Sequence, residues 1–342
     1  MLEQGDRSLA RTWKGARRSI VLTARDASVL MRDEPAVPVR AAGRSVNLTA
    51  IAAAMSQISA SLTAILDLEP LERNLFRGRS PKSSWPRVFG GQVIAQSLYA
   101  ACKTVEGRQP HSLHAYFLLP GDPEIPIVYE VDRLRDGRSF TTRRVLAIQK
   151  GEAIFAMSAS FQVEEAGYEH QMPMPKVPMP EELPDREEMA KTFLSHVPDA
   201  IQAYYQRKRP IEIRPVELER YRGGGKMEPK FNVWIKAMES LPDEPAFHQS
   251  VLAYASDLLL LDSSLIAHGT SVFDQKIQAA SLDHAMWFHR PFRTDEWLLY
   301  SQDSPSSSGA RGFSRGLIFD REGRLVASVA QEGLIRPRLD RA

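Results

Sequence analysis

The chain has 342 residues, of which 43% are apolar and 25% are charged, so it is long enough for two domains with large cores. The formal net charge is only +2, and no strong field attracts nucleic acid. The single cysteine, Cys102, cannot form an internal disulfide, and no apolar run reaches the roughly 18 residues of a membrane span, so we expect a soluble, cytoplasmic protein with no membrane partner.

Residues 1–54 differ from the rest of the chain. They are rich in arginine, but acids such as Glu3 and Asp26 intervene, as they do not in a transit peptide. No sustained period of 2 or 3.6 residues occurs before Val46. We therefore expect a disordered extension, or a wrongly assigned start with Met55 as the true first residue.

The first half of the remaining chain predicts helices followed by strands. The helices are expected at 58–66 and 88–105, and the second is apolar on most faces, which is typical of a buried helix. Gly90 and Gly91 near its start permit close backbone approach. Strands are expected at 76–79, 112–119, 127–134, 140–148 and 153–163.

Prolines between 173 and 184 indicate a linker, with a short helix near 187–194, and the pattern then resumes. A second apolar helix is expected at 248–266. Strands are expected at 211–216, 231–237, 277–289, 297–302, 315–320 and 324–332.

The two halves resemble each other. The tract 112–115 matches 281–285, and Gly137 and Gly309 stand at the same distance before Gly151 and Gly323. A helix followed by antiparallel strands, repeated once, predicts an α+β double hotdog: two antiparallel sheets, each wrapped around a long central helix. The expected parts are an N-terminal hotdog at 55–165, a linker at 166–210 and a C-terminal hotdog at 211–338.

Asp257 interrupts an apolar run and is a candidate catalytic base. A carboxylate in such surroundings is costly unless it is paired, and burial raises its pKa and its basicity toward water. The alternative is a structural aspartate inside a helix, bonded to a hydroxyl such as that of Ser256. Residue patterns alone do not decide between the two.

Other motifs carry less weight. Residues 312–316 match the G-x-S-x-G pattern, but Ser314 precedes a strand and not the helix that a nucleophile elbow requires. No zinc-binding or nucleotide-binding spacing occurs, so we expect no metal and no cofactor. His114, His284 and His289 do not have the spacing of zinc ligands. A ligand that carries phosphate groups would need cationic contacts, and the candidates are Arg77, Arg87, Arg143, Arg290 and Arg315.

Several tracts resemble the acyl-CoA thioesterase II family of double-hotdog enzymes, over about residues 55–336. The tracts are 75–78, 88–92, 116–122, 254–257, 283–291 and 331–333. The resemblance implies hydrolysis of fatty acyl-CoA to free acid and CoA. It implies that Asp257, Ser281 and Gln331 hold and activate one water molecule, and that the chain forms a homodimer or homotetramer.

The first hotdog has no acid between Trp85 and Tyr99, so we expect one catalytic site per chain, in the C-terminal hotdog. Two other functions remain open. Asp262 and His268 faintly match the pair of a hotdog enoyl-CoA hydratase, and a non-enzymatic acyl-CoA sensor would use the same fold.

Overall fold

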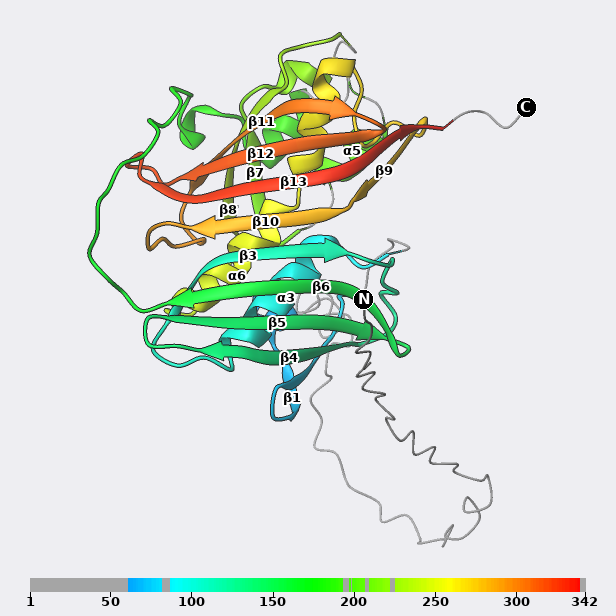
Figure 1. The fold of residues 1–342 in the computed structure, drawn as a ribbon. Helices are drawn as coiled ribbons and strands as arrows, with labels where there is room; N and C mark the ends of the chain where they lie inside the picture. The colour runs from blue at the N-terminus through cyan, green and yellow to red at the C-terminus, as the bar shows by residue number, and fades with distance from the viewer. Residues whose placement is uncertain are drawn as a thin grey trace, which may run out of the picture. The chain divides into compact units, whose positions relative to one another are not determined.

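The computed structural model describes residues 61–81, 87–192, 197, 199–206, 209–221 and 225–338 (Figure 1). All of them belong to one compact unit. The predicted extension, residues 1–54, lies outside the described residues. The described part of the predicted helix 58–66 is α2 (Leu62–Leu66).

Among the described residues, 13 strands form one antiparallel sheet. The spatial order in the first half is β1 (Glu69–Glu72), β2 (Leu75–Gly78), β4 (Ile127–Asp136), β5 (Phe140–Gln149), β6 (Glu152–Gln162) and β3 (Gln109–Phe117). The order continues with β10 (Asp283–Phe288), β13 (Leu325–Pro337), β12 (Arg311–Phe319), β11 (Leu298–Ser308), β8 (Lys230–Ala237) and β7 (Ile211–Pro215). β9 (Ile277–Ser281) lies off this path and pairs with β13.

The two halves join where β3 pairs with β10. Ala115 lies opposite His284, and His114 lies opposite Ala285. These are the two tracts whose similarity indicated a duplication, and such reciprocal pairing is what a local twofold axis produces. The two predicted sheets are therefore halves of one continuous sheet.

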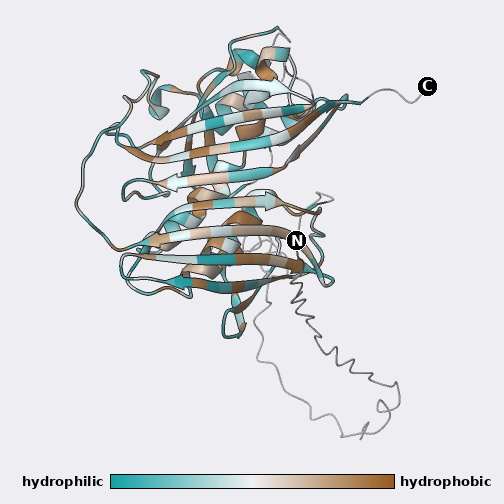
Figure 2. Ribbon diagram, viewed as in Figure 1, coloured by the Kyte–Doolittle hydropathy of each residue, from teal (hydrophilic) through white to brown (hydrophobic). Residues whose placement is uncertain are grey.

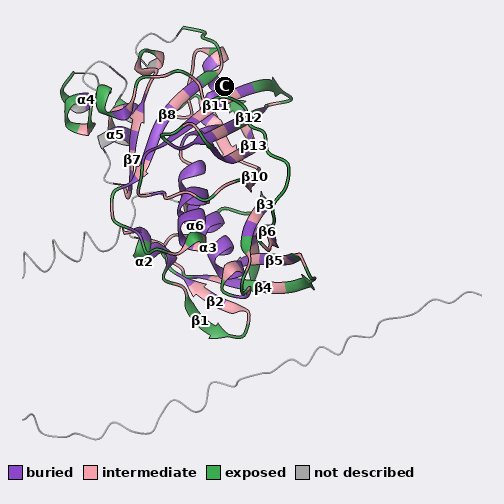
Figure 3. Cartoon of the chain, turned by 90° about the vertical axis from the view of Figure 1, so that its left-hand side faces the viewer, coloured by how far each residue is buried: buried purple, intermediate pink, exposed green. Residues whose placement is uncertain are grey.

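Two buried helices lie side by side within the curve of this sheet, drawn in purple in Figure 3. They are α3 (Gly90–Cys102) and α6 (Pro245–Ser256), and every residue of α3 from Gly91 to Ala101 is buried. On the sheet, hydrophobic and hydrophilic residues alternate along the strands (Figure 2), as in β5, whose buried positions mostly alternate with more exposed ones. The side chains of the inner face and of the helices form the core.

The predicted helix 248–266 is wrong in its second half. α6 ends at Ser256, and the chain continues as a 3-10 helix, η4 (Leu260–His268). Ser263 and Ser264 bond back to the carbonyls of their own turn, which competes with a regular helix. By length and composition the stretch Pro245–His268 could cross a membrane, but 83% of its apolar 18-residue window is buried inside the fold.

Two strand predictions also need correction. The predicted strand 277–289 is interrupted at Leu282, which separates β9 from β10. The predicted strand 297–302 is too short, because β11 continues through the serine-rich segment to Ser308, where Ser306 and Ser307 pair with β12. Cross-strand pairing here overrides the low strand propensity of the local sequence.

The linker follows the outside of the sheet from β6 to β7 (Figure 1). The indole of Trp234 donates to the carbonyl of Pro178 over 2.9 Å, which fastens the proline-rich part to the second half. The short segments are η1 (Pro180–Glu182), α4 (Arg186–Thr192), α5 (Asp199–Gln206) and η3 (Leu218–Tyr221). α4 was predicted, whereas α5 was not.

Candidate active site

Asp257 lies where α6 ends, and not inside a helix as the sequence predicted. Its backbone (φ −90°, ψ 0°) leaves the helical conformation directly after Ser256. Its backbone N–H still bonds to the carbonyl of Ala255, so the residue closes the last turn. The side chain is partly buried.

The structure brings the three predicted site residues together. The Nε2 of Gln331, on β13, donates to Asp257 Oδ1 over 2.9 Å. The Oγ of Ser281, at the end of β9, donates to the same oxygen over 3.4 Å, which is a longer and weaker bond. A carboxylate, a hydroxyl and an amide therefore converge from three separate elements, the combination that can hold a water molecule.

The start of α3 approaches the same carboxylate, and this contribution was not among the predicted site residues. The backbone N–H of Gly91 donates to Asp257. A Cβ at Gly90 would lie only 2.6 Å from Asp257 Oδ2, and one at Gly91 would collide with the carbonyl oxygen of Tyr254. The glycine pair at the start of a buried helix was the sequence signal for this close approach.

The surroundings make the carboxylate of Asp257 basic. Burial raises its pKa from 3.8 to about 6, although the hydrogen bonds from Gln331, Gly91 and Ser281 lower it. Such a group is ionised at neutral pH and still able to accept a proton, as a general base requires. Gln331 is buried, and within the described part of the chain its Oε1 accepts no hydrogen bond from a protein group.

Comparison with known proteins decides the family. Residues 81–162 match the model of the acyl-CoA thioesterase N-terminal domain, and residues 201–334 match that of the acyl-CoA thioesterase. The acyl-CoA thioesterase 2 of Haemophilus influenzae is 39% identical over 283 residues, which cover 82% of this chain and 99% of that protein. The chain belongs to the acyl-CoA thioesterase II family.

Two further relatives agree. The human acyl-coenzyme A thioesterase 8 is 41% identical over 288 residues, covering 81% of this thioesterase and 89% of that protein. The crystal structure of an acyl-CoA thioesterase II from Mycobacterium marinum is 44% identical, has a TM-score of 0.67, and covers 81% of this chain and 98% of that one. The predicted hotdog fold and the predicted enzyme class, a thioester hydrolase, are confirmed.

The G-x-S-x-G match and the hydratase-like pair have structural explanations in this thioesterase. Ser314 is buried inside β12, with its Oγ 3.0 Å from the Oγ of Ser263. Because the Ser263 hydroxyl donates to the carbonyl of Leu260, Ser314 is the donor of this bond, and it does not stand on a nucleophile elbow. Asp262 is buried and forms an ion pair with Arg220, whereas His268 is exposed. The hydratase-like pair is therefore not assembled.

Each of the three histidines contacts a different residue. His284 bonds to Ser256, His289 bonds to Ser328, and His114 packs edge-on against Trp287. Among the described residues, no group of three or more His, Cys, Asp or Glu side chains is placed to hold a metal ion.

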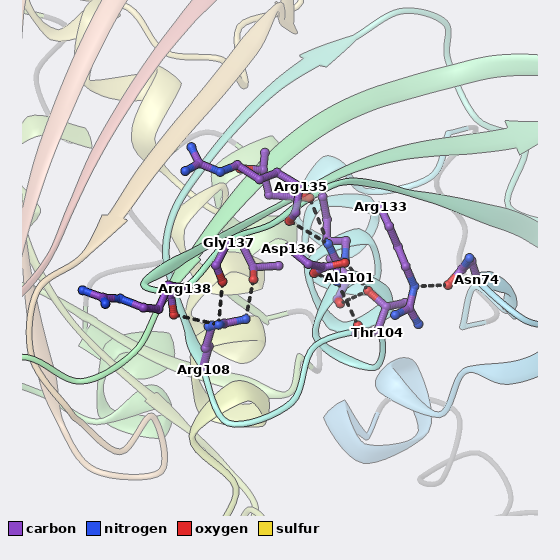
Figure 4. A network of polar contacts seen from close by, with 12 residues as sticks. Asn74, Ala101, Thr104, Arg108, Arg133, Arg135, Asp136, Gly137 and Arg138 are labelled. Atoms are coloured by element: carbon purple, nitrogen blue, oxygen red, sulfur yellow. Dashed lines mark hydrogen bonds and ion pairs between the residues drawn. The ribbon is translucent and has the colours of Figure 1, made fainter.

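Of the five arginines predicted as candidates for phosphate contacts, Arg143 is not available to a ligand. It is buried, and it donates to Thr104 over 2.8 Å and to Asp136 over 2.6 Å, which fastens the β4–β5 hairpin to the end of α3 (Figure 4). The guanidinium of Arg108 extends this network to the carbonyls of Gly137 and Arg138.

The other candidates lie nearer the surface. Arg77 pairs with Glu69, Arg315 pairs with Asp303, and Arg290 donates to a backbone carbonyl in β13. Arg87 is exposed and comes shortly before α3, whose first turn contacts Asp257. Arg87 is therefore the candidate that lies nearest in the sequence to a residue in contact with Asp257.

Proposed function

We propose that this thioesterase hydrolyses fatty acyl-CoA, using a water molecule activated by Asp257 and oriented by Ser281 and Gln331. The observation that carries the proposal is the environment of one carboxylate. Burial raises its pKa to about 6, and side chains from two strands are bonded to it. The raised pKa supports a proton acceptor and the fixed geometry supports a positioned water molecule.

In the proposed reaction the water oxygen attacks the thioester carbonyl carbon, and the water proton passes to Asp257. The tetrahedral intermediate collapses with cleavage of the carbon–sulfur bond, and CoA leaves as its thiolate. The N-terminus of α3 faces the same carboxylate through Gly91. The positive end of this helix therefore lies near the position where negative charge develops in the transition state.

The side chains around the carboxylate suit an apolar acyl group. Phe89 packs edge-on against Tyr254 with ring centroids 5.0 Å apart, and the Phe117 ring lies beside Gly90. Phe89 and Phe117 are partly buried, so their rings can cover a hydrocarbon chain. The exposed guanidinium of Arg87 is our candidate for a contact with a CoA phosphate.

We also propose that the enzyme forms a homodimer or homotetramer through the outer face of the central strands. Tyr116 on β3 is 63% exposed, and beside it the rings of His114 and Trp287 lie 5.3 Å apart. Aromatic side chains of this kind are enriched in interfaces. Light scattering should give a molar mass of two or four times that of one chain. Replacing Tyr116 by Lys should lower this measured mass.

The function is tested by thiol release from saturated acyl-CoAs of increasing chain length. We expect turnover that rises with chain length until the acyl site is filled. A hydratase cannot act on a saturated substrate, so release of free CoA separates the two activities. Binding without thiol release would contradict the proposal and favour an acyl-CoA sensor.

A further inference from the structure

Two residues beside the catalytic group have no part in the reaction described above. Asp283 and His284 begin β10, two and three residues after Ser281. We propose that Asp283 and His284 are positioning residues, which hold the end of α6 and the middle of β13 so that Asp257 and Gln331 meet. This inference rests on the proposed function, because it concerns the same three side chains.

The strand pairing is irregular at this point. Ser281 on β9 pairs with Gly333, whereas Ala285 on β10 pairs with Ala330. The three residues 282–284 therefore face only the two residues 331–332 of β13. An extra residue of this kind is a β-bulge, which bends the strand and redirects its side chains. Ser281 borders this bulge and Gln331 lies within it, so its geometry decides where both side chains point.

Asp283 holds the β13 side of the bulge. Its Oδ1 accepts the backbone N–H of Glu332 over 2.7 Å, a group that regular pairing would have bonded to a carbonyl. The carbonyl of Glu332 in turn accepts the N–H of Leu282 over 3.0 Å. Both backbone groups of the residue after Gln331 are thus fixed by residues 282 and 283.

His284 holds the α6 side. Its buried ring bonds through Nε2 to the Oγ of Ser256 over 2.9 Å, and Ser256 directly precedes Asp257. Because the hydroxyl of Ser256 already donates to the carbonyl of Ala253, His284 is assigned as the donor from Nε2. The Tyr300 hydroxyl donates to the carbonyl of Ser256 over 3.0 Å. The last residue of α6 is therefore held on both its side chain and its backbone.

Asp283 and His284 thus link the end of α6, which supplies the proton acceptor Asp257, to β13, which supplies the amide of Gln331. Neighbouring side chains of a strand point in opposite directions. Here the first reaches the backbone of β13 and the second reaches the end of α6. Because a displacement of about 1 Å at a reacting group can lower a rate by about 10²-fold, these two contacts are expected to control turnover although neither touches water or substrate.

The test compares disruptive and conservative changes at each position. We expect Asp283→Ala and His284→Leu to lower kcat about 10- to 100-fold with little change in KM, because the water is misplaced while substrate binding remains. Asp283→Asn should keep most of the activity, since its amide oxygen still accepts the N–H of Glu332. His284→Gln should restore part of it, since its amide nitrogen can donate to Ser256.

A second buried histidine on α6 provides the matched control. His248 lies in the first turn, away from Asp257, and its Nδ1 accepts the backbone N–H of Thr294 over 3.1 Å. His248→Leu should lower the melting temperature and leave kcat unchanged. Ser256→Ala removes one oxygen atom from the contact with His284 and leaves the fold intact. It should lower kcat by about tenfold, and adding His284→Leu to it should lower kcat little further.

The outcomes separate this inference from the proposed function. Wild-type kcat in Asp283→Ala, or in Ser256→Ala, would overturn the positioning role, and so would an Asp283→Asn variant as impaired as Asp283→Ala. If Asp257→Asn is inactive in the same assay, the proposed function stands and only the inference fails. If Asp257→Asn turns over substrate normally, the proposed function itself is wrong.

Discussion

Replacing Asp257 by Asn should remove the proton acceptor while keeping the size of the side chain and an oxygen for Gln331 to bond. We expect kcat to fall by about 10²–10⁴-fold, the usual effect of losing a general base, and KM to change much less. In the wild type the pKa of Asp257 is raised by burial to about 6. Because only the ionised form accepts a proton, kcat/KM should be roughly tenfold lower at pH 5 than at pH 7.

The assay is thiol release from a saturated acyl-CoA, followed from pH 5 to 8 for the wild type and for Asp257→Asn. The residual activity of the variant should lack the acidic limb of the wild-type profile. Glu296→Gln, an exposed carboxylate before β11, is the matched control and should keep both kcat and the limb. Near-wild-type turnover in a folded Asp257→Asn protein would refute the assignment of the base.

The same substitution has a predictable effect on stability. The pKa of Asp257 is raised by burial from 3.8 to about 6, so the folded chain binds the proton more tightly than the unfolded chain. The wild type is therefore destabilised as the pH rises from about 4 to about 6, by an amount on the order of 2–3 kcal/mol. Asp257→Asn does not titrate. In urea unfolding it should be at least as stable as the wild type at pH 7, and this advantage should shrink toward pH 4.

Further substitutions test the other residues of the site. Gln331→Ala should lower kcat more than Ser281→Ala, because its bond to Asp257 is 2.9 Å and not 3.4 Å, and neither should add much to Asp257→Asn when combined with it. Ser314→Ala should keep most of the turnover and lose about 1 kcal/mol of stability with its bond to Ser263; loss of turnover in the folded variant would restore a covalent mechanism. Gly90→Ala should lower kcat more than about tenfold, because its Cβ would meet the Asp257 carboxylate. Gly167→Ala, where a Cβ meets no atom within 4 Å, should leave kcat and the melting temperature unchanged, and equal kinetics in the two alanine variants would contradict the close approach at Gly90.

The sequence by itself determined much of the architecture. The apolar faces of α3 and the turn signals around β5 are local patterns, and both elements occur within a few residues of their predicted ends. It also singled out Asp257, because a carboxylate inside an apolar run needs an explanation wherever it lies. The resemblance then added Ser281 and Gln331, which local patterns do not distinguish from ordinary strand residues.

Only the tertiary structure decided how these residues meet. Ser281 and Gln331 are 24 and 74 positions from Asp257, and no periodic pattern records a contact across such separations. The end of α6 at Ser256 and the bulge at Leu282 depend on bonds to other elements, as does the burial of Arg143. Local sequence sets which elements can form, whereas the hydrogen bonds that complete this site exist only after the sheet has closed around its two helices.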